Sequence, residues 1–249
     1  MKYKVILFDA DDTLFDFKKT ENYALENLMS SLDTDYDKDY CINIYKEINT
    51  KIWKEFEEGK ITSDDLKIER FQRLIDKLNL SDDAKRLSEL YVKFLSQGSF
   101  LYEDTKDLLD YLSKNYKLGI ITNGLADVQH KRIRESDVGH YFDDVIISDE
   151  IKIAKPNPEI FEYALKSLNH DDKSSVLMVG DSLSSDIKGG LNASIDTCWC
   201  NLSNKINNTD IVPKYEINNL LDLYISSAFL PRRIVGFFSF LIVSVSLII

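Results

Sequence analysis

The sequence predicts an α/β protein in which a doubly wound parallel sheet carries an inserted set of helices. Short, continuous apolar runs recur along the chain, and such runs are typical of strands buried on both faces of a parallel sheet. Stretches of helical period lie between them, and strands that alternate with helices favour a Rossmann-like core. One longer helical stretch, residues 17–99, interrupts the alternation after the first run.

The predicted strands are short and evenly distributed. The first, residues 5–8, reads VILF and runs directly into acidic residues. Similar apolar runs, the last of them weaker, follow at residues 118–121, 145–147, 176–179, 197–200 and 215–217. Helical patterns between them cover residues 105–112, 158–168 and 186–191. This order predicts one sheet with helices on both faces.

The inserted stretch contains no convincing strand. Its apolar residues repeat with helical period at residues 22–28, 44–56, 66–78 and 84–95. Helices of this length with short loops form small bundles. We therefore expect three parts: a core of residues 1–16 and 100–228, a helical cap of residues 17–99 over the carboxyl edge of the sheet, and a hydrophobic tail of residues 229–249.

Composition argues against several classes of protein. The 249 residues carry a formal net charge of −11, whereas phosphate backbones reward lysine and arginine, so we expect no nucleic-acid partner. Cys41, Cys198 and Cys200 are odd in number and lack framework spacing, which argues against a disulfide scaffold. The first residues show no secretion signal, which indicates a cytoplasmic protein.

The end of the sequence is anomalous for such a protein. Residues 234–249 carry no charge and follow Arg232 and Arg233. A spanning helix needs about 20 apolar residues, with a lower limit near 17, so the run is marginal in length. A C-terminal membrane anchor, a buried terminal element and a tail of accidental origin all stay open.

Acidic residues follow the first predicted strand. Asp9, Asp11 and Asp12 stand within four positions, and carboxylates so close repel one another unless a cation is present. In an extended-to-turn segment, Asp9 and Asp11 can point to one side. Mg²⁺ prefers such oxygens, completed by water and phosphate. A solvated acidic turn or a helix N-cap would give the same local pattern.

The next three strands also end in polar residues. Thr122 and Asn123 can bind a phosphoryl oxygen, although Asn-Gly also marks plain turns. Lys155, held before a proline at the entry to a helix, supplies positive charge. Asp181 adds a second carboxylate to the metal site, and Asp186 belongs either to that site or to a helix N-cap.

The four strand ends are more specific together than singly. Ligands of such sheets bind outside the carboxyl ends of the strands. These ends carry, in chain order, an acid pair, a hydroxyl, a lysine and an acid pair. Phosphoryl transfer needs this set: a nucleophile, an acid–base group, a metal site and positive charge on the equatorial oxygens.

The same motifs resemble those of the haloacid dehalogenase superfamily of aspartyl-phosphate phosphatases. The resemblance covers about residues 3–222, and the inserted helices correspond to that family's first type of cap. Asp12 departs from the pattern, because many members have glycine there. The sequence around the first and fourth motifs is similar to the house-cleaning pyrimidine 5′-nucleotidases, which remove phosphate from nucleoside monophosphates.

The resemblance implies a task for each site residue. Asp9 attacks phosphorus, and Asp11 protonates the leaving oxygen and then activates water. Magnesium is bound by the carboxylates of Asp9 and Asp181 and by the backbone carbonyl of Asp11. Asp186 either binds the metal through water or orients the lysine. The phosphoryl oxygens are held by Thr122, Asn123 and Lys155.

Other interpretations stay open at this point. Phosphatases of a sugar phosphate or phosphoglycolate share the fold and motifs, and a phosphomutase uses the same two aspartates. A dehalogenase is disfavoured, because Asp11 and the metal site would be superfluous for its chemistry. The complete set of acids also disfavours a non-catalytic binding protein anchored by its tail. We expect a small phosphorylated partner, in the first place a nucleoside monophosphate.

Overall fold

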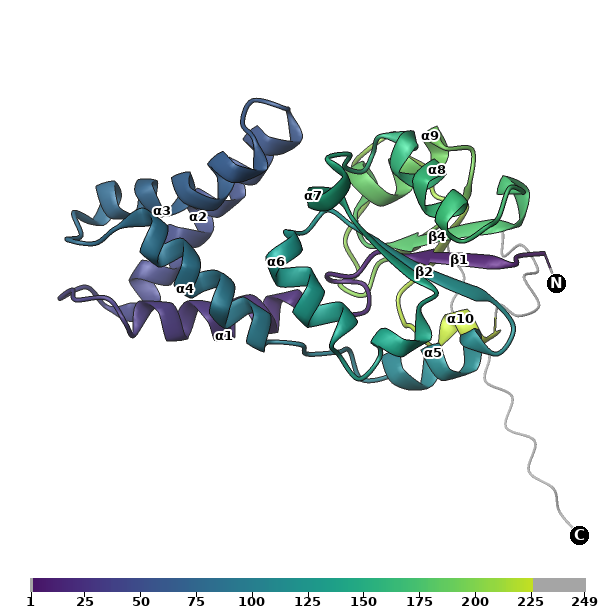
Figure 1. Cartoon of the computed structure of the whole chain (residues 1–249), viewed down its shortest axis with the longest axis horizontal. Coiled ribbons are helices and arrows are strands. Elements are labelled where there is room, and N and C mark those ends of the chain that lie inside the picture. Colours follow the sequence, from purple (N-terminus) through teal and green to yellow (C-terminus); the bar gives the residue numbers. More distant parts are fainter. Residues whose placement is uncertain (1, 226–249) are drawn as a thin grey trace, which may run out of the picture.

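The computed structural model describes residues 2–225, which form a sheet with helices on both faces and a separate group of four long helices beside it (Figure 1). Cys41, Cys198 and Cys200 are buried free thiols. Within residues 2–225, no helix has both the length and the apolar character needed to cross a membrane. The predicted tail of residues 229–249 lies outside the described residues.

The sheet is parallel throughout and has the strand order β3-β2-β1-β4-β5-β6, which confirms the doubly wound core. Its order reverses between β1 and β4, so the switch point lies where these two strands end. All six predicted strands are present, as β1 (Val5–Phe8), β2 (Lys117–Thr122), β3 (Asp144–Ile147), β4 (Val176–Gly180), β5 (Asp196–Cys200) and β6 (Tyr215–Ile217).

Strand β1 explains why its apolar run is continuous. Its side chains alternate between two cores, because successive residues of a strand point to opposite faces. Ile6 and Phe8 pack on the side of α5 (Thr105–Ser113) and α10 (Asp222–Ile225), and Val5 and Leu7 pack on the side of α8 (Pro158–Ser167). Figure 1 shows these helices on opposite sides of the sheet. All four β1 residues are buried.

Short helical turns complete the sheet part. They are α6 (Ala126–Gln129), η1 (His130–Arg134), η2 (Gly139–Tyr141), α7 (Ser148–Ile151), η3 (Lys173–Ser175), η4 (Leu183–Ile187) and α9 (Lys188–Asn192).

One interpretation of the sequence is corrected here. Asp186 does not cap a helix that starts at its own position, because the chain already turns at Leu183 and the Ser182 side chain is the N-cap, accepting from the Ser185 N–H.

The four long helices are called the helical unit: α1 (Phe17–Met29), α2 (Lys38–Glu57), α3 (Ser63–Leu78) and α4 (Ala84–Gln97). Each begins at a side chain that accepts a backbone N–H of the first turn, which is how aspartate and threonine favour helix starts. These caps are Asp16, Asp37, Thr62 and Asp83. Apolar residues of all four helices form a shared core, which continues onto Leu125 and Val128 beside the sheet.

The chain enters and leaves the helical unit at one place. Phe15 and Leu101 form an antiparallel bridge, and the Asp16 N–H donates to the Phe100 carbonyl over 2.9 Å. The Thr20 hydroxyl donates to the Gly98 carbonyl over 3.0 Å. The two segments, residues 15–17 and 98–101, are called the crossing segments. They place the helical unit next to the carboxyl ends of the strands (Figure 1).

Candidate active site

A cavity of about 250 Å³ lies between the carboxyl ends of the strands and the helical unit. Its floor contains Asp9, which directly follows β1, and Asp181, which directly follows β4. The Asp9 N–H donates to the Val179 carbonyl over 2.8 Å, so the pairing of the two central strands continues up to the site. The cavity therefore opens at the switch point of the sheet.

Three carboxylates gather on this floor. Asp9, Asp181 and Asp186 each present an oxygen, and these oxygens lie within 4.8 Å of one another. Burial raises the pKa of Asp9 well above its usual value, and Asp186 and Asp181 add to that rise while Lys155 opposes it. Burial and the neighbouring Asp186 raise the pKa of Asp181 to about 6. Carboxylate oxygens this close fit a hard cation such as Mg²⁺, which would offset their repulsion.

Gly180 lets Asp186 reach this cluster. A Cβ atom on Gly180 would lie 2.3 Å from Oδ2 of Asp186, so a residue with a side chain would push the carboxylate out. The Ser182 N–H donates to the same oxygen over 2.9 Å and fixes its orientation. In the Gly-Asp-Ser sequence, the glycine thus lets the Asp186 carboxylate lie close to the backbone, and the aspartate supplies a charge to the cluster.

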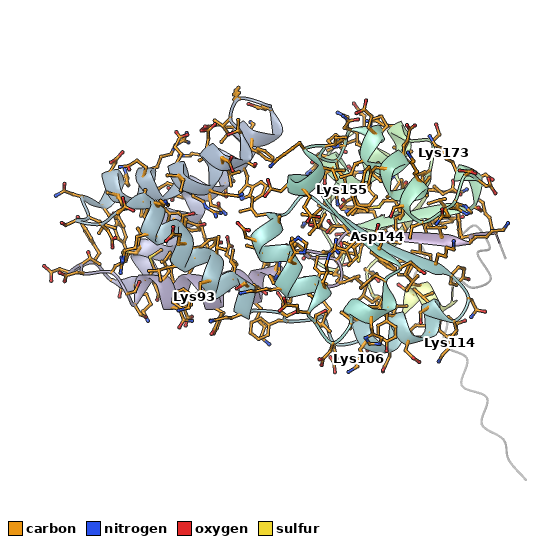
Figure 2. All side chains as sticks on the ribbon, viewed as in Figure 1. Lys93, Lys106, Lys114, Asp144, Lys155 and Lys173 are labelled. Atoms are coloured by element: carbon orange, nitrogen blue, oxygen red, sulfur yellow. The ribbon has the colours of Figure 1, made fainter. Side chains whose placement is uncertain are left out.

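Lys155 is a buried lysine at the same edge of the sheet. It is 3% exposed, and Figure 2 shows it among the packed side chains, whereas Lys106 and Lys114 point outwards. Its ammonium group lies 2.6 Å from Asp9 Oδ1 and 2.7 Å from Asp186 Oδ1, and donates to the Ile121 carbonyl over 2.6 Å. Burial alone would lower the pKa of Lys155, but the two carboxylates outweigh it and raise the pKa.

Thr122 and Asn123 lie beside Lys155 but differ in what they can offer. The Asn123 side chain accepts from the Lys155 N–H over 2.8 Å and donates to its carbonyl over 2.9 Å, so it holds the lysine's backbone in place. The Thr122 hydroxyl accepts from Gln129 over 2.9 Å and from the Gly124 N–H over 3.1 Å. These two bonds leave its own hydrogen available to a ligand.

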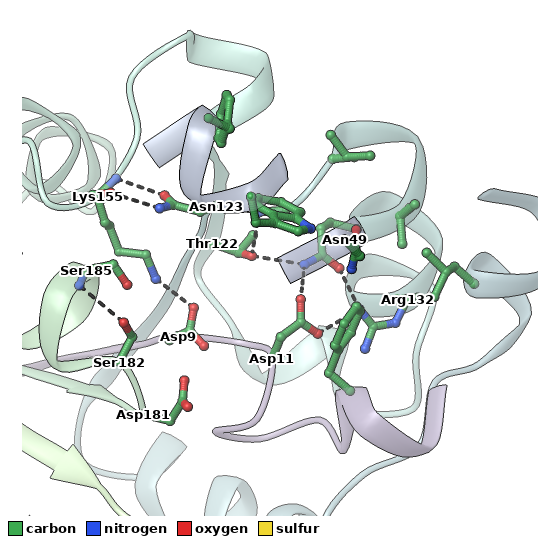
Figure 3. A pocket seen from close by; sticks show the side chains of 18 of the residues that line it. Asp9, Asp11, Asn49, Thr122, Asn123, Arg132, Lys155, Asp181, Ser182 and Ser185 are labelled. Carbon is green, nitrogen blue, oxygen red and sulfur yellow. Dashed lines mark hydrogen bonds and ion pairs between the residues drawn. The ribbon is translucent and has the colours of Figure 1, made fainter. Parts of the chain in front are cut away.

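Asp11 lies at the cavity, but its carboxylate turns away from Asp9. Oδ1 pairs with Arg132 over 2.7 Å, and Oδ2 accepts from Gln129 over 2.6 Å. Figure 3 shows this arrangement: Asp11 faces Arg132, and Asp9 faces Lys155. Among the described residues, the Asp11 carboxylate is not part of the carboxylate cluster.

Asp12, the departure from the family pattern, takes the left-handed backbone conformation. Its φ is +59°, a value that glycine adopts at no cost and aspartate better than most residues. Its carboxylate accepts from the Tyr102 hydroxyl over 3.4 Å, and the residue is absent from the cavity lining. The aspartate therefore takes the turn conformation that glycine has in many members, and its carboxylate lies outside the carboxylate cluster.

The helical unit supplies a wall that sequence reasoning missed. Aromatic and polar side chains from α2, α3 and α4 face the cavity: Asn49, Trp53, Phe56, Arg70 and Tyr91. Arg70 is 2% exposed, and its guanidinium carbon lies 4.7 Å from the Tyr91 ring centre. Its Nε and Nη2 atoms have no hydrogen-bond partner among the described residues. In the sequence these residues follow the ordinary helical period, so nothing distinguishes them from core positions.

Gln129 and Arg132 were also missed, although they contact two predicted residues. They stand three positions apart after β2, a spacing that brings side chains to one helical face. That spacing is the only sequence signal, because the surrounding HKRIR run has the composition of an exposed turn. As a whole, the site holds the buried Asp9 carboxylate with an adjacent ammonium, a cluster of three acids at a cation-sized spacing, and a further carboxylate, that of Asp11, held by two donors.

Comparison with known proteins gives a consistent result. The family model of haloacid dehalogenase-like hydrolases matches residues 3–194. The chain is 34% identical to the pyrimidine 5′-nucleotidase YjjG of Escherichia coli (strain K12), covering 90% of this chain and 97% of that protein. It is 36% identical to the pyrimidine 5′-nucleotidase PynA of Streptococcus pneumoniae (strain ATCC BAA-255 / R6), covering 90% and 94%.

A solved structure has the same architecture. The orthorhombic form of the HAD-hydrolase YfnB from Bacillus subtilis superposes with a TM-score of 0.83 at 37% identity, covering 90% of this chain and 98% of that chain. That crystal structure is described as bound to magnesium and as revealing interdomain movement.

Proposed function

The chain belongs to the haloacid dehalogenase-like hydrolases, and we propose that it is a magnesium-dependent phosphatase that removes the 5′-phosphate of pyrimidine nucleoside monophosphates. One observation carries this proposal. Asp9 is buried at the end of the central strand with the Lys155 ammonium 2.6 Å from one oxygen and two further acids at a cation-sized spacing. A carboxylate so placed is suited to attack a phosphate that its own charge would otherwise repel.

The proposed reaction has two steps, both centred on Asp9. An Asp9 oxygen forms a bond to phosphorus while the bond from phosphorus to the ester oxygen breaks, and protonated Asp11 gives its proton to that oxygen. Water then attacks phosphorus, Asp11 takes a proton from it, and the bond from Asp9 to phosphorus breaks. Nucleoside leaves after the first step and inorganic phosphate after the second.

Positive charge and donors offset the charge of the phosphate. Asp9, Asp181 and Asp186, with the backbone carbonyl of Asp11, would hold Mg²⁺, which supplies positive charge when bound. All three N–H groups of Lys155 already face protein oxygens, so its contribution is charge beside the nucleophile more than a new hydrogen bond. Thr122 retains a hydroxyl hydrogen for a phosphoryl oxygen.

The nucleotide assignment has two supports. YjjG and PynA, the relatives described above, are pyrimidine 5′-nucleotidases. The wall of the helical unit adds a chemical reason, because the aromatic residues Trp53, Phe56 and Tyr91 line the same cavity as Asp9. Aromatic side chains suit the flat ring of a nucleobase better than a sugar phosphate, which carries no aromatic ring.

We further propose that the helical unit, within residues 17–99, acts as a cap. The chain passes between the sheet part and the helical unit at the paired segments around Asp16 and Phe100, so a small change there would tilt the unit. Closure would exclude bulk water from Asp9 while the phosphate is transferred.

A phosphate-release assay with Mg²⁺ tests the proposal. Four substrates would be compared on wild type and on D9N: thymidine monophosphate, deoxyuridine monophosphate, ribose 5-phosphate and phosphoglycolate. We expect the two nucleotides to turn over fastest and D9N to lose at least about 10³-fold in kcat while it still unfolds cooperatively. Sugar phosphates turned over as fast as nucleotides would overturn the substrate assignment, and an active D9N would overturn the mechanism.

A further inference from the structure

Arg132 is the largest fully buried side chain among the described residues, at 1% exposure. It lies on η1, in the sheet part, beside the entrance to the helical unit. A guanidinium keeps its charge in any protein environment, and burying it is costly unless its donors are paired. Where those donors go therefore indicates what the residue does.

One end of the guanidinium holds the proposed acid. Nη1 lies 2.7 Å from Asp11 Oδ1 and 3.1 Å from the Gln129 side-chain oxygen. Gln129 in turn donates to Asp11 Oδ2 over 2.6 Å. Each oxygen of Asp11 thus has one donor, and the carboxylate is held towards α6 and away from the Lys155 ammonium (Figure 3).

The other end of the same side chain reaches the segments that lead into and out of the helical unit. Nε donates to the Gly98 carbonyl over 3.0 Å, and the Ser99 hydroxyl donates to the backbone carbonyl of Arg132 over 2.7 Å. The guanidinium carbon lies 5.3 Å from the ring centre of Phe17, the first residue of α1. Arg132 therefore contacts both crossing segments.

Because the guanidinium is planar and rigid, Nε and Nη1 cannot move independently. A tilt of the helical unit changes the crossing segments, which shifts the Gly98 carbonyl and the Phe17 ring together. The same shift must move the nitrogen that holds Asp11.

We propose that Arg132 is a positioning residue that couples the place of the Asp11 carboxylate to the orientation of the helical unit. In the arrangement described here, Asp11 is held away from the place where an ester oxygen leaves Asp9-bound phosphorus. Movement of the crossing segments carries Asp11 into that place. The inference rests on the proposed function, because it assigns Asp11 the proton transfer to the leaving oxygen.

The test compares two esters that differ in their need for a proton. The 5′-oxygen of thymidine monophosphate leaves only with a proton, whereas 4-nitrophenolate leaves without one. Rapid-quench release of thymidine and the burst of 4-nitrophenolate report the first step alone. For R132Q we expect thymidine release to fall about 100-fold and the nitrophenolate burst to fall less than about threefold.

Two controls separate positioning from folding. R134Q alters an exposed arginine on the same turn, which bonds the Val145 carbonyl, and should leave both rates within about twofold. Equal losses for both esters in R132Q would overturn the proposal. If R132Q does not fold, R132K replaces it in the test, because lysine keeps the charge but not the planar fork. Thymidine release by R132K at the wild-type rate would also overturn the proposal.

Coupling to the crossing segments has its own readout. Thr20 donates to the Gly98 carbonyl that Arg132 also contacts, and T20V removes this bond together with the hydroxyl's longer contact, 3.2 Å, to the Asp16 carbonyl. We expect T20V to lower thymidine release about threefold in wild type and to add nothing in R132Q. Independent effects of the two changes would refute the coupling. A wild type that hydrolyses other alkyl phosphates better than nucleotides would refute the substrate assignment instead, and the comparison would be run on that alkyl ester.

Discussion

The Lys155 ammonium and the Asp186 carboxylate form an ion pair 2.7 Å long in which both side chains are 1% exposed. Such a pair is costly to form and more costly to break, because removal of one partner leaves a buried charge without compensation. In this site the cost is larger still, since Asp9 shares the same ammonium. The lysine therefore holds together a cluster that would otherwise repel itself.

Replacement of Lys155 by methionine should consequently destabilise the protein by about 3–5 kcal/mol in the absence of Mg²⁺. Added Mg²⁺ should raise the unfolding temperature of K155M more than that of wild type, because the ion then supplies the positive charge that Asp9 and Asp186 have lost. Differential scanning calorimetry with and without Mg²⁺ measures both effects. K173M, at a half-exposed surface pair with Glu162, should change stability by less than about 0.5 kcal/mol. An Mg²⁺ response equal to that of wild type would contradict the prediction.

Removal of the metal should abolish turnover, and loss of one acid should weaken metal binding. After treatment with EDTA, we expect activity to return only with added Mg²⁺ or a similar divalent ion. In D181N, the Mg²⁺ concentration that gives half-maximal activity should rise at least about tenfold. D12N is the matched control, since Asp12 is a neighbouring acid outside the carboxylate cluster. An unchanged Mg²⁺ requirement in D181N would remove this residue from the metal site.

Asp149 connects the sheet part to the helical unit away from the crossing segments. It accepts from the Ser63 hydroxyl over 2.9 Å and from Lys67 over 3.1 Å, both on α3. Burial acts to raise the pKa of Asp149, but hydrogen bonds from Lys152, the Ala126 N–H, Ser63 and Lys67 outweigh it and hold the pKa well below its usual range.

D149N should therefore lose about 1–3 kcal/mol in the free energy of unfolding at pH 7. A lowered folded-state pKa stabilises the protein above the unfolded value of about 3.9, and this contribution disappears as the pH falls from there towards the folded value. The difference in the free energy of unfolding between wild type and D149N should accordingly become smaller below about pH 3.9. Urea unfolding at several pH values measures it. D64N removes the exposed partner of the same Lys67 and should have little effect at any pH.

We expect Trp53 to contribute to binding of the nucleobase and not to binding of the phosphate. W53L is expected to raise KM for thymidine monophosphate about tenfold through lost ring contact and to change KM for ribose 5-phosphate less than twofold. Y40L changes an exposed aromatic residue on the same helix, outside the cavity lining, and serves as the control. Equal increases for both substrates would show that Trp53 does not contact the base.

The sequence was most informative where a buried run meets polar residues. The run from Val5 to Phe8 fits a strand buried on both faces, and parallel strands bring their carboxyl ends to one edge. Asp9, Thr122, Lys155 and Asp181 could therefore be placed near one another without coordinates. Periodicity also located the inserted helices, because their apolar faces repeat regularly.

Side-chain direction could not be obtained in the same way. Nothing in the sequence shows that Asp11 turns to Arg132 or that the Asn123 amide binds the backbone of Lys155, because both depend on how loops from different strands meet. Arg70 and Trp53 were hidden for another reason. They share the period of core residues, and only the packing of α2 and α3 shows that they face a cavity.

The pairing of the two crossing segments has a consequence for how such proteins acquire new substrates. Because the Phe15–Leu101 bridge brings the two ends of the insertion together, the helices could be excised and the gap closed by a short turn without altering the strand order. An insertion with adjacent ends is a transplantable module. A different bundle grafted between the same two residues would meet the same nucleophile and the same acids, so the chemistry could stay constant while the choice of ester changes.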